Sequence, residues 1–191
     1  MSTAQRSSRA LLVVDVQPTF CEGGALAVPG GDAVAGRIAE YALSRRGDYA
    51  LVVTTQDWHV DPGAHFSPTP DFVDSWPPHG IAGSEEAELH PALAGLRPDA
   101  RVRKGQYAAA YSGFEGVTDD GTGLDEVLRS RRITDVDVVG LAESHCVACT
   151  AVDAARADFK TRVLRELTAP VTEELGASAR QWMTSEHVEI V

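Results

Sequence analysis

The chain has few cysteines, no excess of basic residues and no long apolar run, and each shortage argues against a class of protein. Its three cysteines are an odd number in an ordinary globular composition, which indicates free thiols in a reducing compartment rather than a disulfide framework. The formal net charge is -11 and the basic residues are scattered, so we expect no nucleic-acid surface and no anionic membrane partner. A small neutral or cationic ligand fits this charge better.

Apolar runs are also too short for secretion or for crossing a membrane. The first of them, Ala10–Val14, stops at Asp15 and is shorter than the apolar core of a signal peptide. No stretch approaches the roughly 20 apolar residues that a transmembrane helix needs. We therefore expect a soluble protein of the cytoplasm.

The sequence does contain short apolar runs that alternate with amphipathic segments of helical length. We predict strands at Ala10–Val14, Tyr49–Thr54, Arg101–Lys104, Val136–Gly140, Thr161–Leu164 and Val188–Val191. We predict helices at Asp32–Arg46, Leu124–Arg132, His145–Ala157 and Thr172–Thr184, the first and last of them capped by Asp32 and Thr172. This alternation is typical of βαβ units around a buried parallel sheet.

The predicted fold is therefore α/β, with three layers and a mostly parallel, doubly wound sheet of six strands in the order 3-2-1-4-5-6. A chain of 191 residues can bury roughly 70% of its unfolded surface, which is enough for a core without disulfides. We expect one domain, residues 1–191, with no linker to a second.

One segment, between Gln56 and Arg97, breaks the alternation. Its stretch SPTPDFVDSWPPHG is too rich in proline for a regular helix or a central strand, because proline lacks the amide donor and fixes φ. A long ordered loop in a compact domain is usually functional.

The same loop gathers carboxylate and imidazole groups, which together suit zinc, iron or manganese. The candidate ligands are Asp57, His59, His65 and His79. Chelation would also order a segment that has few backbone hydrogen bonds. The alternative for any single histidine is a solvated loop residue. His90 is a rival ligand, ranked below His79 because of its distance from the others and the proline after it.

Cys146 follows a predicted strand and a short turn, and it opens the next predicted helix. The positive end of the helix dipole would lower its pKa and raise its thiolate fraction, which makes it the candidate nucleophile. Cys149, one turn deeper, and Cys21, in a glycine-rich stretch, are interpreted as small buried or partly buried thiols.

Asp15 and Lys104 each lie at the end of a predicted strand. Taken alone, the first suits a structural carboxylate and the second a solvated side chain. In a doubly wound sheet, however, ligands bind beyond the carboxyl ends of the strands, where the strand order reverses between the first and the fourth. Asp15, Cys146 and the metal loop converge on that crevice, so we expect a site there.

Specific stretches cover nearly the whole chain: VDVQPTFCEGGALAVPGG, DWHVDPGAHFSPTPDF with SWPPHG, RKGQYAAAYSGFEG and VDVVGLAESHCVACTAVDA. On these stretches the sequence resembles nicotinamidase/pyrazinamidase enzymes of the isochorismatase-like cysteine hydrolases. The resemblance implies hydrolysis of nicotinamide to nicotinate and ammonia, and of pyrazinamide, through a thioester on cysteine. It also implies one divalent metal ion that holds the substrate ring, with zinc expected ahead of iron or manganese.

The resemblance further implies a role for each site residue. The catalytic triad would be Asp15, Lys104 and Cys146, and the metal ligands would be Asp57, His59, His65 and His79. The substrate would contact Phe20, Trp76, Tyr111 and Leu141. A cis peptide is implied between Leu141 and Ala142, with the amides of Ala142 and Cys146 forming the oxyanion hole.

Three positions depart from the family's pattern. Ser144, preceded by Glu143, stands where an aspartate is usual; Pro18-Thr19 replaces Asn-Asp; and Gly80 replaces a cysteine. None of them removes a catalytic or metal-binding group. They bear on substrate preference and on hydrogen bonding around the triad and the metal loop.

The assigned groups meet the needs of amide hydrolysis, which are a nucleophile, donors for the oxyanion and an acid for the leaving nitrogen. Asp15 would take the proton of Cys146 and return it to ammonia, while Lys104 holds Asp15 in place. The metal would orient the substrate ring.

Other interpretations stay open. Another amide or ureido hydrolase of the same superfamily is the nearest, and a non-catalytic metal-binding or ligand-binding module is more remote. A papain-like hydrolase is disfavoured, because the histidine near Cys146 is His145, which is adjacent in sequence and poorly placed as its base. The sequence leaves the oligomeric state open.

Overall fold

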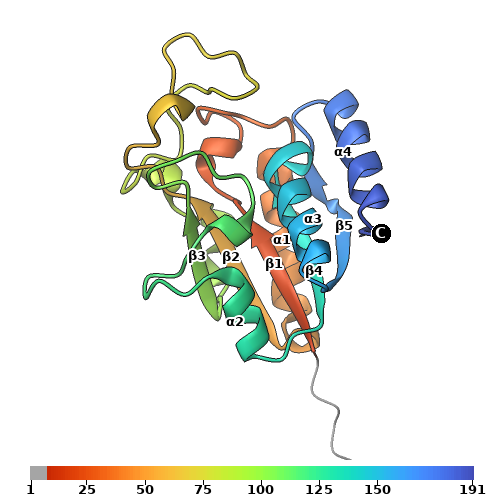
Figure 1. Cartoon of the computed structure of the whole chain (residues 1–191). Coiled ribbons are helices and arrows are strands. Elements are labelled where there is room, and N and C mark those ends of the chain that lie inside the picture. Colours follow the sequence, from red (N-terminus) through yellow and green to blue (C-terminus); the bar gives the residue numbers. More distant parts are fainter. Residues whose placement is uncertain (1–7) are drawn as a thin grey trace, which may run out of the picture.

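The computed structural model describes residues 8–191 and shows a parallel sheet between two helical layers (Figure 1). Residues 1–7 of the predicted domain lie outside the described part. The strands are β1 (Arg9–Val14), β2 (Leu51–Asp57), β3 (Ala100–Lys104), β4 (Asp135–Leu141), β5 (Lys160–Ala169) and β6 (Glu189–Ile190). They form a six-stranded sheet in the order β3-β2-β1-β4-β5-β6 with parallel neighbours, which confirms the predicted order.

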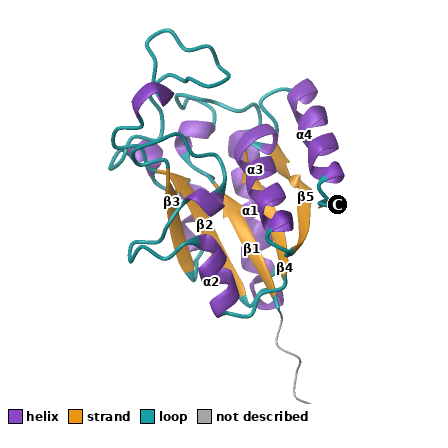
Figure 2. Ribbon diagram, viewed as in Figure 1, coloured by secondary structure: helices purple, strands orange, loops and turns teal. Residues whose placement is uncertain are grey.

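Helices cover both faces of the sheet because its central strands are apolar on both faces (Figure 2). The helices are α1 (Gly31–Ser44), α2 (Leu124–Ser130), α3 (Ala148–Arg156) and α4 (Glu173–Ser185). Within β1, Leu12 belongs to the core under α2, α3 and α4, whereas Leu11 and Val13 belong to the core under α1. Successive side chains of a strand point to opposite faces, so each face needs its own helical layer. Among residues 8–191 no helix is long and apolar enough to cross a membrane.

The predicted cap of α1 is wrong, and the predicted cap of α4 is confirmed. Helix α1 begins at Gly31, so Asp32 lies in its first turn rather than before it. A carboxylate from the preceding loop takes the capping role instead, since Glu22 accepts from the amides of Gly30 and Asp32 at 2.7 Å each. At α4, the side chain of Thr172 accepts from the third amide of the helix at 3.2 Å.

The helix predicted at His145–Ala157 is two elements. A π-helical turn, Glu143–Val147, comes first and contains the candidate nucleophile, and α3 follows it. Single π-helical turns are frequent at functional sites. Strand β5 also runs beyond its predicted end at Leu164, to Ala169, after a register shift against β4.

The carboxyl ends of β1 to β4 lie along one edge of the sheet. Asp15 directly follows β1, and Asp57 and Lys104 are the last residues of β2 and β3. The backbones of β1 and β4 pass so closely that a Cβ atom on Gly140 would lie 2.0 Å from the carbonyl oxygen of Val14. Glycine is required there, also because its φ is +127°. This close approach brings the end of β4 next to Asp15.

Candidate active site

Asp15 is fully buried at the first position beyond β1. Its φ is +47°, a left-handed conformation that aspartate adopts more readily than most residues. Thr55 Oγ1 donates to Asp15 Oδ1 at 2.5 Å, and Lys104 Nζ lies 3.0 Å from Oδ2. Burial raises the pKa of Asp15, with Lys104 opposing it and the Asp57 carboxylate adding to it. Asp15 therefore holds a proton more tightly than an exposed aspartate does.

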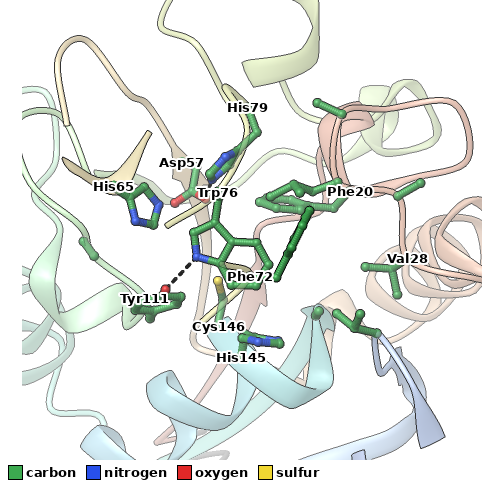
Figure 3. A pocket seen from close by; sticks show the side chains of 16 residues that line it. Phe20, Val28, Asp57, His65, Phe72, Trp76, His79, Tyr111, His145 and Cys146 are labelled. Carbon is green, nitrogen blue, oxygen red and sulfur yellow. Dashed lines mark hydrogen bonds and ion pairs between the residues drawn. The ribbon is translucent and has the colours of Figure 1, made fainter. Parts of the chain in front are cut away.

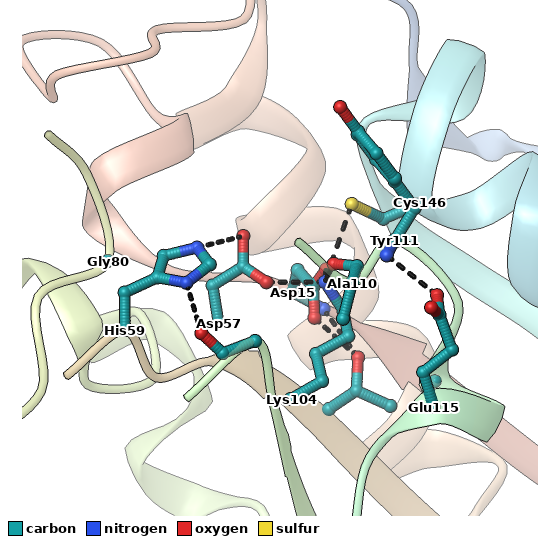
Figure 4. A network of polar contacts seen from close by, with 12 residues as sticks. Asp15, Asp57, His59, Gly80, Lys104, Ala110, Tyr111, Glu115 and Cys146 are labelled. Carbon is teal, nitrogen blue, oxygen red and sulfur yellow. Dashed lines mark hydrogen bonds and ion pairs between the residues drawn. The ribbon is translucent and has the colours of Figure 1, made fainter. Parts of the chain in front are cut away.

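Lys104 lies fully buried between the other charged groups of the site (Figure 4). Its ammonium pairs with Asp57 Oδ1, donates to the carbonyl oxygen of Ala110 at 3.1 Å, and lies 3.7 Å from Cys146 Sγ. Burial by itself would lower the pKa of Lys104, but the carboxylates of Asp15 and Asp57 hold it well above its usual value. Lys104 is therefore a fixed positive charge between two carboxylates and a thiol.

Cys146 is 6% exposed, and its Sγ lies within 4.8 Å of the carboxylates of Asp15 and Asp57. The prediction of a lowered thiol pKa is wrong. Burial raises the pKa of Cys146 well above its usual value; Lys104 opposes the shift, and both carboxylates add to it. Because α3 begins only at Ala148, the thiol also precedes the regular helix whose dipole was expected to act on it. The resting thiol is therefore protonated and needs a nearby base.

The three histidines among the predicted metal ligands form one buried group. Candidate ligand atoms of His59, His65 and His79 lie within 4.8 Å of one another. His59 Nδ1 lies 2.5 Å from the carbonyl oxygen of Gly105, and His79 Nδ1 lies 2.8 Å from that of Pro77. A carbonyl oxygen can only accept, so both rings carry the proton on Nδ1 and keep a free lone pair on Nε2.

The protonation of this group also suits a metal ion. Within the described residues, His59 Nε2 and His65 Nδ1 are buried without a hydrogen-bond partner. Burial lowers the pKa of His79 to about 4 and also lowers that of His65. Metal binding requires neutral imidazoles, which the lowered pKa values of His65 and His79 favour, and the ligand nitrogens of the three rings lie close together. The residues present therefore fit a divalent ion with nitrogen and carboxylate ligands.

Asp57 connects the histidine group to the charged cluster. Its Oδ2 lies 3.6 Å from His59 Nε2 and 3.7 Å from His79 Nε2, while its Oδ1 pairs with Lys104. Burial alone would raise the pKa of Asp57, but Lys104 and His59 outweigh it and hold the pKa below its usual range. Asp57 is therefore an anion that faces the histidines with one oxygen and the lysine with the other.

A glycine after β3 allows this arrangement. A Cβ atom on Gly105 would lie 2.5 Å from His59 Cε1, and the φ of Gly105 is +74°. Both facts require glycine. The carbonyl that orients His59 therefore comes from a residue that the sequence prediction did not include.

A cavity of about 300 Å³ joins the thiol to the histidine group (Figure 3). Its wall includes most of the residues singled out in the sequence, namely Phe20, Asp57, His65, Trp76, His79, Tyr111, Ala142 and Cys146. Trp76 Nε1 donates to Tyr111 Oη at 2.9 Å, which fixes both rings over the cavity. The cavity thus offers aromatic walls, a thiol and a group of metal-binding type to one small ligand.

Leu141 is placed differently from its predicted role in substrate contact. Its side chain is fully buried in the core under α1, and Ala142 lines the cavity instead. As the last residue of β4, Leu141 directs its side chain into the layer that α1 covers, and the next residue is the first to face the site. The implied cis peptide between Leu141 and Ala142 is present. The oxyanion hole at the amides of Ala142 and Cys146 stays a prediction.

Eight residues of the cavity wall were absent from the predicted site, and the two aromatic ones among them are His145 and Phe72. His145 packs against Trp76 and Tyr111, with ring centroids 5.6 Å and 6.4 Å away. Phe72, in the proline-rich loop, faces Trp76 at 6.0 Å. The position of His145 directly before the nucleophile could have indicated it, whereas nothing in the loop sequence distinguishes Phe72 from its neighbours.

The remaining candidates lie away from the histidine group. His90 Nε2 is 3.1 Å from Asp32 Oδ1, and its Nδ1 accepts from the amide of Ala92. The proton of a neutral His90 is then on Nε2, so this nitrogen has no lone pair for a metal ion. Burial raises the pKa of Cys21 to about 12 and that of Cys149 to about 11, as suits a buried thiol at Cys21 and a partly buried one at Cys149.

Comparison with known proteins identifies the family of this chain. The sequence matches the isochorismatase domain over residues 9–188. It is 51% identical to a nicotinamidase/pyrazinamidase of Mycobacterium tuberculosis over 96% of this chain and 98% of the relative. A zinc-bound pyrazinamidase of Pyrococcus horikoshii has a similar structure, with a TM-score of 0.83, 34% identity and coverage of 96% of this chain and 98% of the other. The PnC1 protein of L. infantum, solved with nicotinate, has a TM-score of 0.83 and 32% identity over 100% of this chain and 95% of its own.

Proposed function

This chain belongs to the isochorismatase family, and from that premise we propose that it hydrolyses nicotinamide to nicotinate and ammonia through a thioester on Cys146. One observation carries the proposal: a single aromatic cavity is lined by the thiol and by two histidines of the buried histidine group, and the buried Asp15–Lys104 pair lies directly behind the thiol. Such a cavity suits a flat ring that carries an amide. The relative at 51% identity is a nicotinamidase/pyrazinamidase, which supports the same substrate here.

In the first half of the reaction, Asp15 takes the proton of Cys146 and the thiolate attacks the amide carbon. The raised pKa of Asp15 suits this base, because the proton moves between two buried groups of increased proton affinity. The amides of Ala142 and Cys146 would donate to the oxyanion. The C–N bond then breaks, Asp15 returns the proton to the nitrogen, and ammonia leaves.

In the second half, Asp15 removes a proton from water, and the hydroxide attacks the thioester carbon. The C–S bond breaks, the acid is released, and the proton on Asp15 returns to the sulfur. Lys104 stays charged throughout, because its two carboxylate neighbours hold its pKa high. Its role is to hold the Asp15 carboxylate and the thiol in position and to balance the negative charge that moves between them.

The substrate ring would lie between Phe20 and Trp76, with its nitrogen toward the histidine group. A divalent ion, which we propose to be zinc, would be held by Asp57, His59, His65 and His79 and would supply a Lewis-acidic point for the ring nitrogen. Trp76, fixed by its hydrogen bond to Tyr111, limits rotation of the ring. This placement brings the carboxamide to Cys146.

The direct test is to incubate the metal-loaded protein with nicotinamide and to measure ammonia and nicotinate together. Equal amounts of both products are expected. The cysteine pair on one helical segment provides a matched control: Cys146→Ala should abolish turnover, and Cys149→Ala should retain it. Absence of turnover with zinc, iron and manganese in turn would reject the proposed function, and turnover by Cys146→Ala would reject the nucleophile.

Pyrazinamide is the second substrate that we propose for the same cavity. The M. tuberculosis relative and the P. horikoshii structure are both pyrazinamidases, which supports it. The same assay with pyrazinamide should release ammonia and pyrazinoate from the same thiol. Activity on nicotinamide without any on pyrazinamide would limit the proposal to the first substrate.

A further inference from the structure

Ser144 and His145, which directly precede the nucleophile, belong to a short chain of hydrogen bonds whose outer members, Val171 and His145, line the cavity. The amide of Val171, in the segment after β5, donates to Ser144 Oγ at 3.2 Å. Ser144 Oγ in turn lies 3.0 Å from His145 Nδ1. The serine hydroxyl therefore connects a backbone donor on one side to an imidazole nitrogen on the other.

One direction of this chain pairs every protein donor and acceptor around the Ser144 hydroxyl. The Val171 amide can only donate, so Ser144 Oγ accepts from it. In the described part of the chain, the acceptor within reach of the Ser144 hydroxyl proton is His145 Nδ1. A nitrogen that accepts this proton carries none of its own. Burial also lowers the pKa of His145, so the ring is neutral and its proton lies on Nε2.

The Nε2 atom belongs to a ring of the cavity wall. His145 lines the cavity beside Cys146, and its ring packs against Trp76 and Tyr111 (Figure 3). Among residues 8–191, the His145 ring forms its hydrogen bond through Nδ1, and Nε2 has no partner. A ring fixed on one side by Ser144 and on two others by aromatic neighbours thus has one polar atom left for a ligand.

We propose that Ser144 is a positioning residue that holds His145 in the Nε2–H form, so that the cavity presents a hydrogen-bond donor to the substrate. This donor favours aromatic amides that carry a further acceptor beyond the metal-bound nitrogen and the amide, such as a second ring nitrogen. The substrate part of the inference rests on the proposed function, whereas the tautomer does not. A carboxylate at position 144 would reverse the polarity, because it can only accept and would place the proton on Nδ1.

Nitrogen NMR of the imidazole side chains tests the tautomer without any turnover. The wild-type protein should show His145 protonated on Nε2, and Ser144→Asp should show it on Nδ1. Ser144→Ala should give a mixture, and Ser144→Thr, which keeps the hydroxyl, should restore the wild-type form. Ser178→Ala is the matched control, because that hydroxyl bonds within α4. A wild-type His145 protonated on Nδ1, or a tautomer unchanged in Ser144→Ala and Ser144→Asp, would overturn the inference.

Calorimetric binding in the Cys146→Ala background tests the effect on substrates, again without hydrolysis. Pyrazinamide has one more ring nitrogen than nicotinamide, so its affinity relative to nicotinamide should fall about fivefold on adding Ser144→Ala, the effect of one lost neutral hydrogen bond. Ser144→Thr should preserve the ratio. An equal loss for both amides would overturn the substrate preference. Failure of the wild-type enzyme to hydrolyse either amide would instead count against the proposed function. The NMR measurement of the tautomer and the calorimetric binding ratio would still be interpretable, because neither depends on turnover.

Discussion

Asp15 and Asp137 are both fully buried aspartates beside basic side chains, yet their proton affinities are shifted in opposite directions. Asp137, nearer the amino ends of the strands, accepts from Arg9 at 2.5 Å, from Tyr49 at 2.8 Å and from Arg162 at 2.7 and 2.8 Å. Burial would raise the pKa of Asp137, but these donors outweigh it and the pKa is lowered.

Fewer donors offset the effect of burial on the pKa of Asp15. It receives one hydroxyl and lies beside one lysine, which Asp57 also uses, so burial dominates and the pKa is raised. A carboxyl group with several donors stays ionised and links neighbouring strands through its hydrogen bonds. A carboxyl group that shares its one cation with another carboxylate keeps a higher pKa and can exchange a proton. The number of donors therefore separates the structural acid from the proposed base.

The largest expected effect comes from exchanging the proposed base for its isosteric amide. Asp15→Asn should lower kcat/KM for nicotinamide about 10³-fold, because general base and acid catalysis are both lost. Thermal unfolding should change little, since the amide fills the same space and removes a buried charge. Asp137→Asn should show the reverse pattern, with near-normal kcat/KM. Retained activity in Asp15→Asn would show that another group accepts the thiol proton.

A second comparison uses two histidines, the proposed metal ligand His79 and the rival candidate His90. His79→Ala should lower zinc affinity about 100-fold or more, because it removes a direct ligand, and activity should fall with occupancy. His90→Ala should bind zinc normally, because His90 contacts Asp32 rather than the histidine group. Metal analysis after dialysis gives the stoichiometry, with one ion per chain expected. Equal metal loss in both variants would contradict the assignment of the ligands.

Removing the charge of the well-compensated aspartate should destabilise the protein without affecting chemistry. Asp137→Asn should lower the free energy of unfolding by about 3 kcal/mol, because two arginines lose their shared anion in a buried position. Urea unfolding followed by circular dichroism measures this change. Asp135→Asn is the control, since that carboxylate is partly exposed and should contribute less. Equal losses of unfolding free energy in Asp137→Asn and Asp135→Asn would show that burial does not increase the contribution of the ion pair.

The smallest effect is the dependence of that stabilisation on pH. The pKa of Asp137 is lowered on folding, so its contribution is complete above the unfolded value of about 3.9 and disappears as the pH falls through the folded value. The difference in unfolding free energy between wild type and Asp137→Asn should therefore shrink between about pH 5 and about pH 2. Urea titrations at several pH values measure it. A difference that is constant over this range would indicate that the pKa of Asp137 is not lowered.

Much of the fold and of the site could be predicted from short-range pattern. The apolar runs predicted the central strands β1, β2 and β4 and a parallel sheet, because a strand covered on both faces is almost wholly buried. The candidate metal ligands could be grouped from the sequence because Asp57 ends β2 and the three histidines follow it in the proline-rich loop. The helix around Cys146 was harder, since a π-helical turn and an α-helix have similar composition.

By itself, the sequence determined which residue types stand at the ends of the strands, and so which groups meet at the crevice. Only the tertiary structure decided how each of them is charged. The pKa shift of Cys146 depends on Lys104 and on two carboxylates from other strands. The opposite pKa shifts of Asp15 and Asp137 depend on hydrogen-bond donors that lie far away in the chain. The place of His145 likewise depends on rings from two loops. Burial and long-range contacts determine the proton affinity of these groups, and neither can be predicted from the residues adjacent in sequence.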